Sequence, residues 1–498
     1  ERFKPADAPK YRLEETFEPL AFTPAVMPVA TIVIPVYGKS QLTYTCLKSL
    51  HACTPHDMVE IVVVDDAGPE PAAEALAMVA GIRVERNAHN LGFIGTCNRG
   101  AELARGEHVV LLNNDTEPQP GWLRAMLDRL DDDPRNGVVV AKLVYPDGTL
   151  QEAGGIVWRD GNAWNYGNGA YRDAPEYNFA RPVDYGSAAA MVVRGEVWTA
   201  LGGFDERFAP GYWEDADLCF GARELGWEVM YEPEAMVIHH EGGSMGTDEG
   251  SGGKRHQALN RPRFAQKWHK ALMKQVPHAA FDRAPLAADR RPGPVVLVID
   301  HRMPRPDHDA GSLRMYHVIR NLVDLGCRVM FIPDNFHAEE PYASELREMG
   351  VQVVAGSVDL NWYLSTFGPW MRLAIVSRPY VAPRYVHAIR QHAPRALIAY
   401  DTVDLHFLRE QRKAEQQGDT LAISDSFRHI ELGLAGATDV TLVVSPDEGK
   451  VINDLTGAQT AVVPLANPIL ADVQSDASHA IRGPRSTHRD RSRRSRGS

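Results

Sequence analysis

The 498-residue sequence contains little cysteine, and its few cysteines form no recognisable pattern. There are five, an odd number, and none belongs to a C-x-x-C pair. This excludes a disulfide framework and a cysteine-rich zinc site, and it favours a reducing compartment. We therefore expect a cytoplasmic protein.

Long hydrophobic runs are also missing. No stretch approaches the roughly 18 apolar residues that a membrane-spanning helix needs. The first 17 residues lack the pattern of a signal peptide, and the absence of an initial Met is typical of a fragment. Any membrane contact is expected to be peripheral, at the inner face of the plasma membrane.

Positive charge is scarce over most of the chain, whose net charge is −12. This argues against nucleic acid as a partner of the folded body. The segment 471–498 differs, because Ile481 to Ser498 holds seven Arg against the single acid Asp490. We predict a disordered tail there. A solvated tail is the simpler interpretation, and attraction to anionic lipid or nucleic acid is the alternative.

Short β-branched runs that alternate with helical patterns are abundant. ATIVIPVY, EIVVVDD, GIRVERN and EHVVLLNND read as strands, with helices expected over 40–51 and 93–104. This alternation implies βαβ units and a parallel sheet, with ligands beyond the carboxyl ends of the strands.

A change of composition after Lys274 indicates a second domain. Residues 276–293 are rich in Pro, Ala and charge and read as a linker. Strand and helix patterns then resume from VVLVID to TAVVP. We predict an extension over 1–28, a first α/β domain over 29–275 and a Rossmann-like α/β domain over 294–470.

Two acidic motifs follow predicted strands of the first domain. Asp65 could accept the imide N–H of a uracil or thymine base, although a turn or helix cap before Gly68 is the alternative. In LLNNDT, Asp115 and its Asn neighbours offer hard oxygen ligands, which suit Mg²⁺ or Mn²⁺ bridging a diphosphate. An Asx-turn is the alternative for this second motif.

A carboxylate cluster opens a third motif, GYWEDADLCFGARELG. Glu214 and Asp215 fall in the first turn of a predicted helix, where the dipole favours anions. That placement is also common on plain surface helices. However, Tyr212 and Trp213 form an apolar lip that would desolvate a carboxylate and raise its basicity. Such a base is what group transfer to an alcohol requires.

Two histidines, His239 and His240, close the apolar run before Glu241 and two glycines. A histidine is more often structural than a ligand. If Asp115 and His239 share one cation, the mixed oxygen and nitrogen ligation suits Mn²⁺.

These motifs in this order resemble the family 2 glycosyltransferases of GT-A fold. The residues concerned are Asp65-Asp66, NLGFIGTCNRG, LLNNDT, GGFDERFAPGYWEDADLCFGARELGW and VIHHEGG. The bacterial rhamnosyl- and galactofuranosyltransferase branch is the most similar, and the resemblance covers about residues 29–272. It implies a GT-A fold with a Rossmann-like mixed sheet.

The resemblance also implies a role for each matching residue. It assigns Asp215 as general base, Glu214 and Trp213 to the acceptor side, and Asp115 and His239 to the metal. The usual D-x-D motif reads Asn113-Asn114-Asp115 here, which leaves Asp115 as the main carboxylate ligand. The implied nucleotide-binding residues are Pro35, Val36, Tyr37, Asp65, Asn90, Asn98 and Asn114.

The expected reaction is an inverting, Mn²⁺- or Mg²⁺-dependent sugar transfer. The donor would be a UDP- or dTDP-linked sugar. The acceptor would be a hydroxyl of a glycan or a lipid-linked oligosaccharide in bacterial surface polysaccharide synthesis. A sugar nucleotidyltransferase is disfavoured because IPVYGKS is not a Gly-rich loop. A catalytically inactive glycan-binding or assembly protein is the remaining alternative.

The second predicted domain resembles, more loosely, the N-terminal half of a family 4 glycosyltransferase of GT-B fold. This resemblance rests on VVLVIDHRMPRPDHDAGSLRM and IAYDTVDLHFLRE. The chain ends before a second, donor-binding half, so we expect no independent catalyst there. The loop Asp309 to Ser312 could hold an acceptor, and a scaffold or partner-binding role is the alternative.

Overall fold

The computed structural model describes residues 17–240, 254–278 and 283–464. The first part of the predicted extension, the end of VIHHEGG and the Arg-rich tail lie outside these ranges. The chain divides into two compact units. The first is Glu1–Met303, Ile319–Ala374 and Ala388–Ala396, and the second is Pro304–Val318, Ile375–His387 and Leu397–Ser498. The predicted domain boundaries stay predictions, because this division runs through the second sheet rather than between the two sheets.

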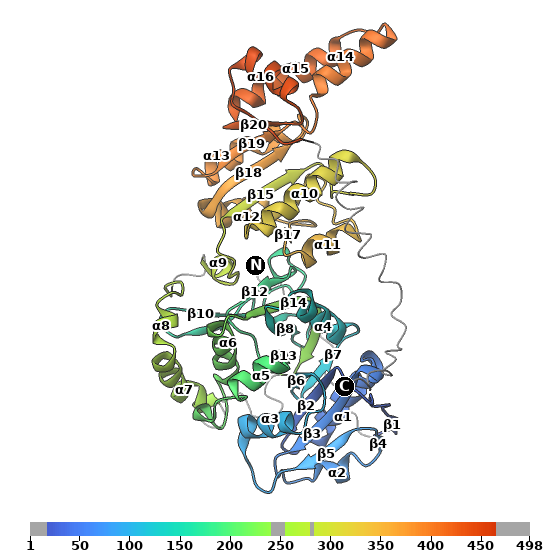
Figure 1. The fold of residues 1–498 in the computed structure, drawn as a ribbon, viewed down its shortest axis with the longest axis vertical. Coiled ribbons are helices and arrows are strands. Elements are labelled where there is room, and N and C mark those ends of the chain that lie inside the picture. Colours follow the sequence, from blue (N-terminus) through green and yellow to red (C-terminus); the bar gives the residue numbers. More distant parts are fainter. Residues whose placement is uncertain (1–16, 241–253, 279–282, 465–498) are drawn as a thin grey trace, which may run out of the picture. The chain divides into compact units, whose positions relative to one another are not determined.

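The first unit contains a ten-stranded mixed sheet (Figure 1). Its main order is β12-β14-β8-β13-β6-β2-β3-β5, with β7 paired to β14 and β9 paired to β8. The strands are β2 (Ala30–Val36), β3 (Val59–Asp65), β5 (Arg83–Arg86), β6 (His108–Leu112), β7 (Thr116–Pro118), β8 (Asn136–Val144), β9 (Leu150–Glu152), β12 (Arg181–Pro182), β13 (Ala190–Arg194) and β14 (Glu228–His239).

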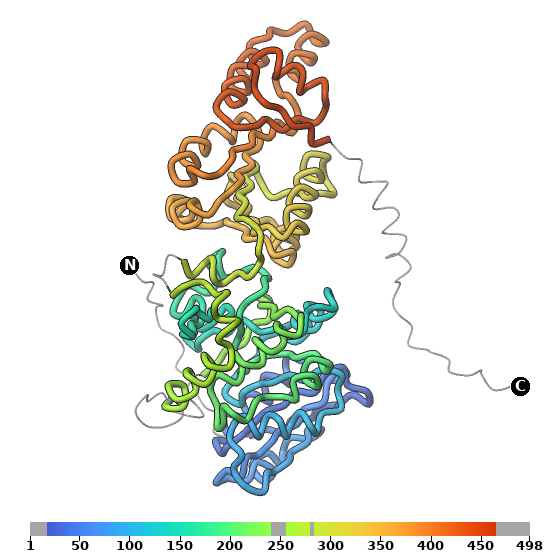
Figure 2. The backbone as a smooth tube through the Cα atoms, turned by 60° about the vertical axis from the view of Figure 1, so that its left-hand side comes forward, coloured from blue at the N-terminus to red at the C-terminus, as the bar shows by residue number. Residues whose placement is uncertain are grey.

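The strand directions make this sheet mixed rather than wholly parallel. β2 is parallel to β3 and to β6, and β3 is parallel to β5, as the βαβ pattern predicts. β13 runs antiparallel to both β6 and β8. It therefore separates the parallel strands β6, β2, β3 and β5 from β8 and the strands beyond it. Strands far apart in sequence thus lie side by side, as the backbone trace shows (Figure 2). The mixed Rossmann-like sheet is confirmed.

Helices cover both faces of this sheet. In Figure 1, α3, α5 and α6 lie on one side of the strands and α1 and α4 on the other. Successive side chains of β2 point to opposite faces of the sheet, and both faces are buried. Val33 packs into one apolar cluster, and Ile32 and Ile34 pack into the other. The helices of this region are α1 (Ser40–Cys53), α2 (Ala72–Ala75), α3 (Gly92–Glu102), α4 (Trp122–Asp132), α5 (Gly195–Leu201), α6 (Glu214–Glu224), α7 (Lys254–Lys267) and α8 (His269–Leu272).

Two small sheets complete this region. β1 (Leu20–Ala21) pairs with β4 (Val79–Ala80), and β10 (Gly155–Val157) pairs with β11 (Ala163–Asn165). The predicted extension over 1–28 therefore contributes a strand at residues 20–21.

The second sheet has seven strands in the order β17-β16-β15-β18-β19-β20-β21. This order reverses between β15 and β18, which is typical of a doubly wound Rossmann-like region. Its strands are β15 (Val295–Asp300), β16 (Arg328–Pro333), β17 (Gln352–Val353), β18 (Met371–Ser377), β19 (Leu397–Asp401), β20 (Val440–Val443) and β21 (Thr460–Val462). Its helices are α9 (Ala284–Ala287), α10 (Ala310–Asp324), α11 (Tyr342–Glu348), α12 (Leu360–Phe367), α13 (Val386–His392), α14 (His406–Gln417), α15 (Ala422–Ala437) and α16 (Pro446–Thr456).

The described part of the predicted linker is packed within the first unit. Asp289 is 5% exposed and pairs with Arg291, whose backbone carbonyl accepts from Arg328. Arg290 pairs with the buried Asp184. Composition predicted a linker here, and it could not show that these charged side chains pair with one another and with the first unit.

None of the described helices is both long enough and apolar enough to cross a membrane.

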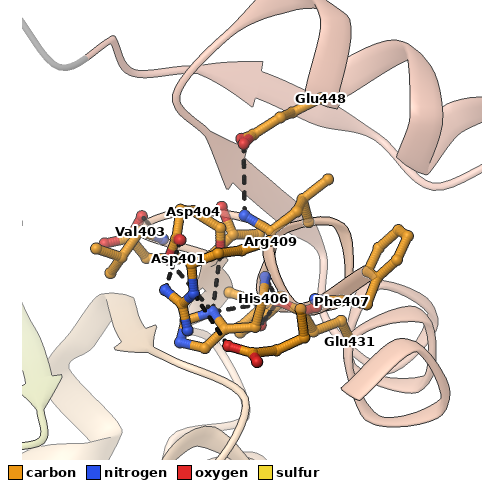
Figure 3. Close-up of polar contacts among 12 residues, drawn as sticks. Asp401, Val403, Asp404, His406, Phe407, Arg409, Glu431 and Glu448 are labelled. Carbon is orange, nitrogen blue, oxygen red and sulfur yellow. Dashed lines mark hydrogen bonds and ion pairs between the residues drawn. The ribbon is translucent and has the colours of Figure 1, made fainter. Parts of the chain in front are cut away.

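A buried carboxylate organises the helical part of the second unit (Figure 3). Glu431 of α15 is fully buried and accepts the backbone N–H groups of His406 and Phe407 at 3.1 and 2.8 Å. These N–H groups belong to the first turn of α14, where no helical partner exists. The Tyr400 hydroxyl, on β19, lies 3.3 Å from the same carboxylate. Glu431 therefore caps α14 from a neighbouring helix.

Replacing Glu431 by Gln should loosen α14. One carboxylate oxygen becomes an NH₂ group that faces backbone donors, so at least one buried N–H loses its acceptor. We expect a loss of about 1–3 kcal/mol in stability, seen as faster amide hydrogen exchange over residues 406–417. Glu415→Gln on the exposed face of α14 is the control, and equal exchange in both variants would contradict the capping role.

Candidate active site

A cavity of 580 Å³ lies where strands of the first sheet end. Pro35, Val36 and Tyr37 line it at the end of β2, and Asn114 and Asp115 line it just beyond β6. The start of α6 contributes the carboxylates of Glu214 and Asp215, and the end of β14 contributes the imidazole of His239. The cavity therefore lies beyond the carboxyl ends of the strands, where the sequence predicted a ligand.

Most of the predicted nucleotide-binding residues reach this cavity. Tyr37 is 56% exposed, so its ring is open to a ligand. Asn90 also lines the cavity, and its side chain accepts from Gly92 N at 3.0 Å. Asn114 is buried and donates to the Thr43 hydroxyl at 3.1 Å. These residues offer an aromatic ring and amide groups rather than a concentrated charge.

Asp65 is not among the residues that line the cavity, and its assignment to the nucleotide stays a prediction. Its carboxylate accepts the backbone N–H groups of Gly68 and Ala72 at 3.0 and 2.9 Å, and it pairs with Arg86. It therefore closes the turn after β3, which is the alternative that the sequence left open.

Asp66 occupies the position that was predicted for Asp65. It lines the cavity, and its oxygens accept from Leu91 N and Gly92 N at 2.7 and 2.9 Å. The Asn87 side chain donates to it as well. Asp66 thus fixes the loop that carries Asn90 against the end of β3. The DD pair contained this signal, but not which acid faces inward.

Asn98 is also absent from the cavity lining. Its amide donates to Phe204 O at 2.9 Å and accepts from Phe204 N at 2.8 Å. These two hydrogen bonds connect α3 to the loop after α5. These bonds give Asn98 a structural role, and the implied contact with nucleotide stays a prediction.

Asp115 and His239 come together at the cavity floor. His239 Nε2 lies 3.3 Å from Asp115 Oδ1, and the two side chains are 11% and 4% exposed. Strand pairing explains this, since His239 pairs with Thr116 and the N–H of His240 donates to Asp115 O. The imidazole of His240 turns instead to Glu117. Only the first histidine of the pair therefore faces the cavity.

The donor set at this point fits one divalent cation together with substrate oxygens. Two ligands at right angles, each about 2.1 Å from an ion, are about 3 Å apart, close to the observed spacing. Asn113 Oδ1, also on the cavity wall, is buried without a hydrogen-bond partner among the described residues. Within the described ranges, no group of three or more His, Cys, Asp or Glu side chains forms a metal site. Mg²⁺ commonly binds through one or two carboxylates and substrate phosphates, so a small protein donor set is compatible.

The three carboxylates at the start of α6 point in two directions. Glu214 and Asp215 line the cavity. Asp217 points away and is bound by Lys267 Nζ and Trp268 Nε1, each at 2.7 Å. It ties α6 to the following helices. The sequence grouped three acids that the helix sends in two directions.

A strained turn delivers the two inward acids. Tyr212 and Trp213 have φ values of 72° and 79°, which non-glycine residues rarely adopt. The fully buried amide of Asn260 donates to the carbonyls of Phe208, Gly211 and Tyr212 and holds this turn. Trp213 is itself 7% exposed and lines the cavity. The strain is maintained where the reactive groups lie.

The environment of these acids favours their protonated forms. Burial and the neighbouring charge of Asp215 raise the pKa of Glu214 well above its usual range. Burial raises the pKa of Asp215 to about 6, against backbone N–H donors that lower it. Asp215 Oδ1 accepts Ala216 N at 2.7 Å, and the backbone of Ala188 also bonds to this carboxylate. A carboxylate with a pKa near 6 is a better base than an ordinary aspartate.

Several lining residues had no counterpart in the sequence prediction. They lie on β9, on β11 and before β13, in segments whose short strands show no clear period. The additional polar members are Gln151, Glu152, Asn165, Tyr185 and Ser187. The only sequence signal was a polar pair, Gln151-Glu152, inside an otherwise apolar stretch.

Comparisons with known proteins identify a similar family and several relatives. Residues 31–193 match the model of "Glycosyl transferase family 2". "O-antigen biosynthesis protein RfbC" of Myxococcus xanthus is 30% identical over 234 residues, which are 44% of this chain and 18% of that protein. "N-acetylglucosaminyl-diphospho-decaprenol L-rhamnosyltransferase" of Mycobacterium tuberculosis is 28% identical over 249 residues, which are 45% of this chain and 80% of that protein.

Coverage limits how far these likenesses extend. "Uncharacterized protein y4gI" of Sinorhizobium fredii is 31% identical over 233 residues, but the match is 25% of its length. The chain thus spans a quarter or less of that relative and of the Myxococcus protein. The matched family region includes β2, β6 and Asp115. Residues 31–193, which lie in the first unit, are therefore similar to the family 2 glycosyltransferases.

Proposed function

We propose that the first unit transfers a sugar, with inversion, from a UDP- or dTDP-linked donor to an acceptor hydroxyl. The observation that supports this best is a single cavity that joins three features. These are the ends of β2 and β6, the Asp115–His239 pair and the Glu214–Asp215 pair. A nucleotide, a diphosphate and an incoming alcohol would each find suitable chemistry there.

Asp215 is the proposed general base. The acceptor oxygen attacks the anomeric carbon while its proton passes to the carboxylate of Asp215. The bond between the anomeric carbon and the phosphate oxygen breaks, and the nucleoside diphosphate leaves with the electron pair. One displacement inverts the anomeric configuration, through an oxocarbenium-like transition state. Burial and the neighbouring charge of Asp215 raise the pKa of Glu214, which favours the protonated form that can donate a hydrogen bond to the acceptor.

Asp115 and His239 are the proposed protein ligands of Mn²⁺ or Mg²⁺. When bound, such an ion supplies Lewis acidity that stabilises negative charge on a departing diphosphate. Asn113 adds a buried amide oxygen to the same wall. We assign Asp66, together with Pro35, Val36 and Tyr37, to the base and ribose. Its remaining lone pairs can accept the imide N–H that uracil and thymine share.

The acceptor is proposed to be a glycan or lipid-linked oligosaccharide of bacterial surface polysaccharide synthesis. The names of the Myxococcus and Mycobacterium relatives support that class. Trp213 and Tyr185 give the cavity aromatic surface, which suits the apolar faces of sugar rings.

Release of nucleoside diphosphate across a panel of UDP- and dTDP-sugars, with and without Mn²⁺, tests the proposal. We expect release with at least one donor, stimulated by an acceptor glycan and by the ion. If donors bind by thermal shift but no panel member is turned over, a glycan-binding or assembly role replaces the transferase.

The rate should fall on the acidic side as Asp215 gains a proton. Its pKa of about 6 lies above the ordinary aspartate value, so the active carboxylate form is present above pH 6 and lost below it. We expect kcat/KM to drop about tenfold per pH unit below 6, because kcat/KM follows the free enzyme. A rate that stays flat down to pH 4.5 would contradict this assignment.

A further inference from the structure

A glutamine outside the predicted site residues contacts the cavity histidine. Gln151 Oε1 lies 3.0 Å from His239 Nδ1, and the glutamine side chain is 3% exposed. Both residues line the cavity. Gln151 belongs to β9 and His239 ends β14, and β8 pairs with both strands. The side chain of Gln151 thus reaches past the end of β8 to the imidazole.

The Gln151 atom that faces His239 determines which ring nitrogen carries the hydrogen. An amide oxygen can only accept a hydrogen bond, so Nδ1 must carry the hydrogen. In a neutral imidazole, Nε2 then keeps its lone pair. Nε2 is the atom that lies 3.3 Å from Asp115 Oδ1. The lone pair is therefore directed toward the proposed cation position.

We propose that Gln151 is a positioning residue that fixes His239 in the Nδ1–H tautomer and so prepares Nε2 to bind a divalent cation. This inference rests on the proposed metal site. Histidine ligands generally donate their second N–H to a carboxylate, a carbonyl or water, and loss of that partner costs about 10- to 100-fold in metal affinity or activity.

Two substitutions at Gln151 separate positioning from packing. Gln151→Glu keeps an acceptor oxygen at nearly the same place, whereas Gln151→Leu keeps the volume and removes the acceptor. A positioning role predicts that Glu retains wild-type Mn²⁺ affinity and that Leu loses about 10- to 100-fold. A packing role predicts the opposite order, because a buried charge is tolerated less well than a leucine.

Affinity is measured with Mn²⁺ alone and with Mn²⁺ plus UDP or dTDP, from the electron paramagnetic resonance signal of the free ion. The buried Gln275, which bonds to Asp184 away from the cavity, supplies the control Gln275→Leu for loss of a buried amide. We expect unchanged Mn²⁺ affinity in that variant. Equal affinity in Gln151→Leu and wild type would overturn the inference.

The tautomer is read independently in metal-free Asp115→Ala protein labelled with ¹⁵N-histidine, because the Asp115 carboxylate, 3.3 Å from Nε2, would itself accept a hydrogen from that nitrogen. In this background, long-range ¹H–¹⁵N spectra should show His239 as Nδ1–H with Gln151 and with Gln151→Glu, and Nε2–H should gain population with Gln151→Leu. An Nε2–H ring in Asp115→Ala with Gln151 intact would overturn the inference by itself. If wild type and Asp115→Ala bind Mn²⁺ equally, the proposed metal site fails instead, and the tautomer result still stands or falls separately.

Discussion

Asp215→Asn should lower kcat by about 10²- to 10⁴-fold, the contribution that a positioned base typically makes. Asparagine keeps the size and the bond from Ala216 N but cannot take the acceptor proton. The expected cost is in kcat rather than in donor binding, because Asp215 contacts the acceptor side. Donor-dependent thermal shift should therefore persist while product formation disappears.

The same substitution should stabilise the fold above pH 6. Burial raises the pKa of Asp215, so the folded state binds its proton more tightly than the unfolded state does. Folding stability from this group is thus greatest at low pH and declines as the pH rises through 6. Removing the acid removes that penalty, and the unfolding midpoint at pH 8 should rise. A fall in both activity and stability would point to damage rather than to loss of a base.

Asp217→Asn is the matched control, two positions along the same helix. Its carboxylate binds Lys267 and Trp268 and does not line the cavity. We expect a lower unfolding midpoint, because two buried bonds are weakened. We expect kcat within about twofold of wild type, because Glu214 and Asp215, which line the cavity, are unchanged. If Asp217→Asn abolished turnover and Asp215→Asn did not, the division of the cluster would be wrong.

Local patterns predicted the order of strands and helices because each buried strand is an uninterrupted β-branched run. β2 and β3 fall within one residue of the expected segments, and β6 ends three residues before its expected end. The same patterns could not show that β13 runs antiparallel, since direction is set by pairing and not by composition. They also missed β9, whose three residues carry no period.

The sequence identified the segments that form the cavity better than it identified the individual side chains that line it. Asp65 and Asn98 illustrate the physical reasons. A resemblance identifies which segment approaches the ligand, but not which of two adjacent acids turns inward. At the end of β3 the alternation of side chains places Asp65 under the turn and Asp66 in the cavity. Asn98 follows Thr96, which lines the cavity, on the same helix, but its own side chain bonds to the backbone of Phe204. Gln151 acts through His239, and no sequence spacing reports a contact between positions 88 residues apart.

Removal of the divalent cation, or of His239, should produce the second large effect. Chelation with EDTA is expected to stop nucleoside diphosphate release, and added Mn²⁺ or Mg²⁺ should restore it. Loss of roughly 4 kcal/mol of charge stabilisation would correspond to about a 10³-fold lower rate. His239→Ala removes the imidazole but leaves Asp115, so we expect a reduced rate that recovers in part at high Mn²⁺ concentration.

His240→Ala separates this role from a general need for imidazole near β7. His240 follows His239 directly, yet its ring faces Glu117 and does not line the cavity. Its rate and its Mn²⁺ dependence should stay within about twofold of wild type. Asp115→Ala should resemble the chelated enzyme and resist rescue, because the remaining protein donors carry no charge. Should EDTA-treated protein, His239→Ala and wild type release product equally, charge on the diphosphate must be neutralised by side chains alone, and the role given to Asp115 would pass to a cationic group.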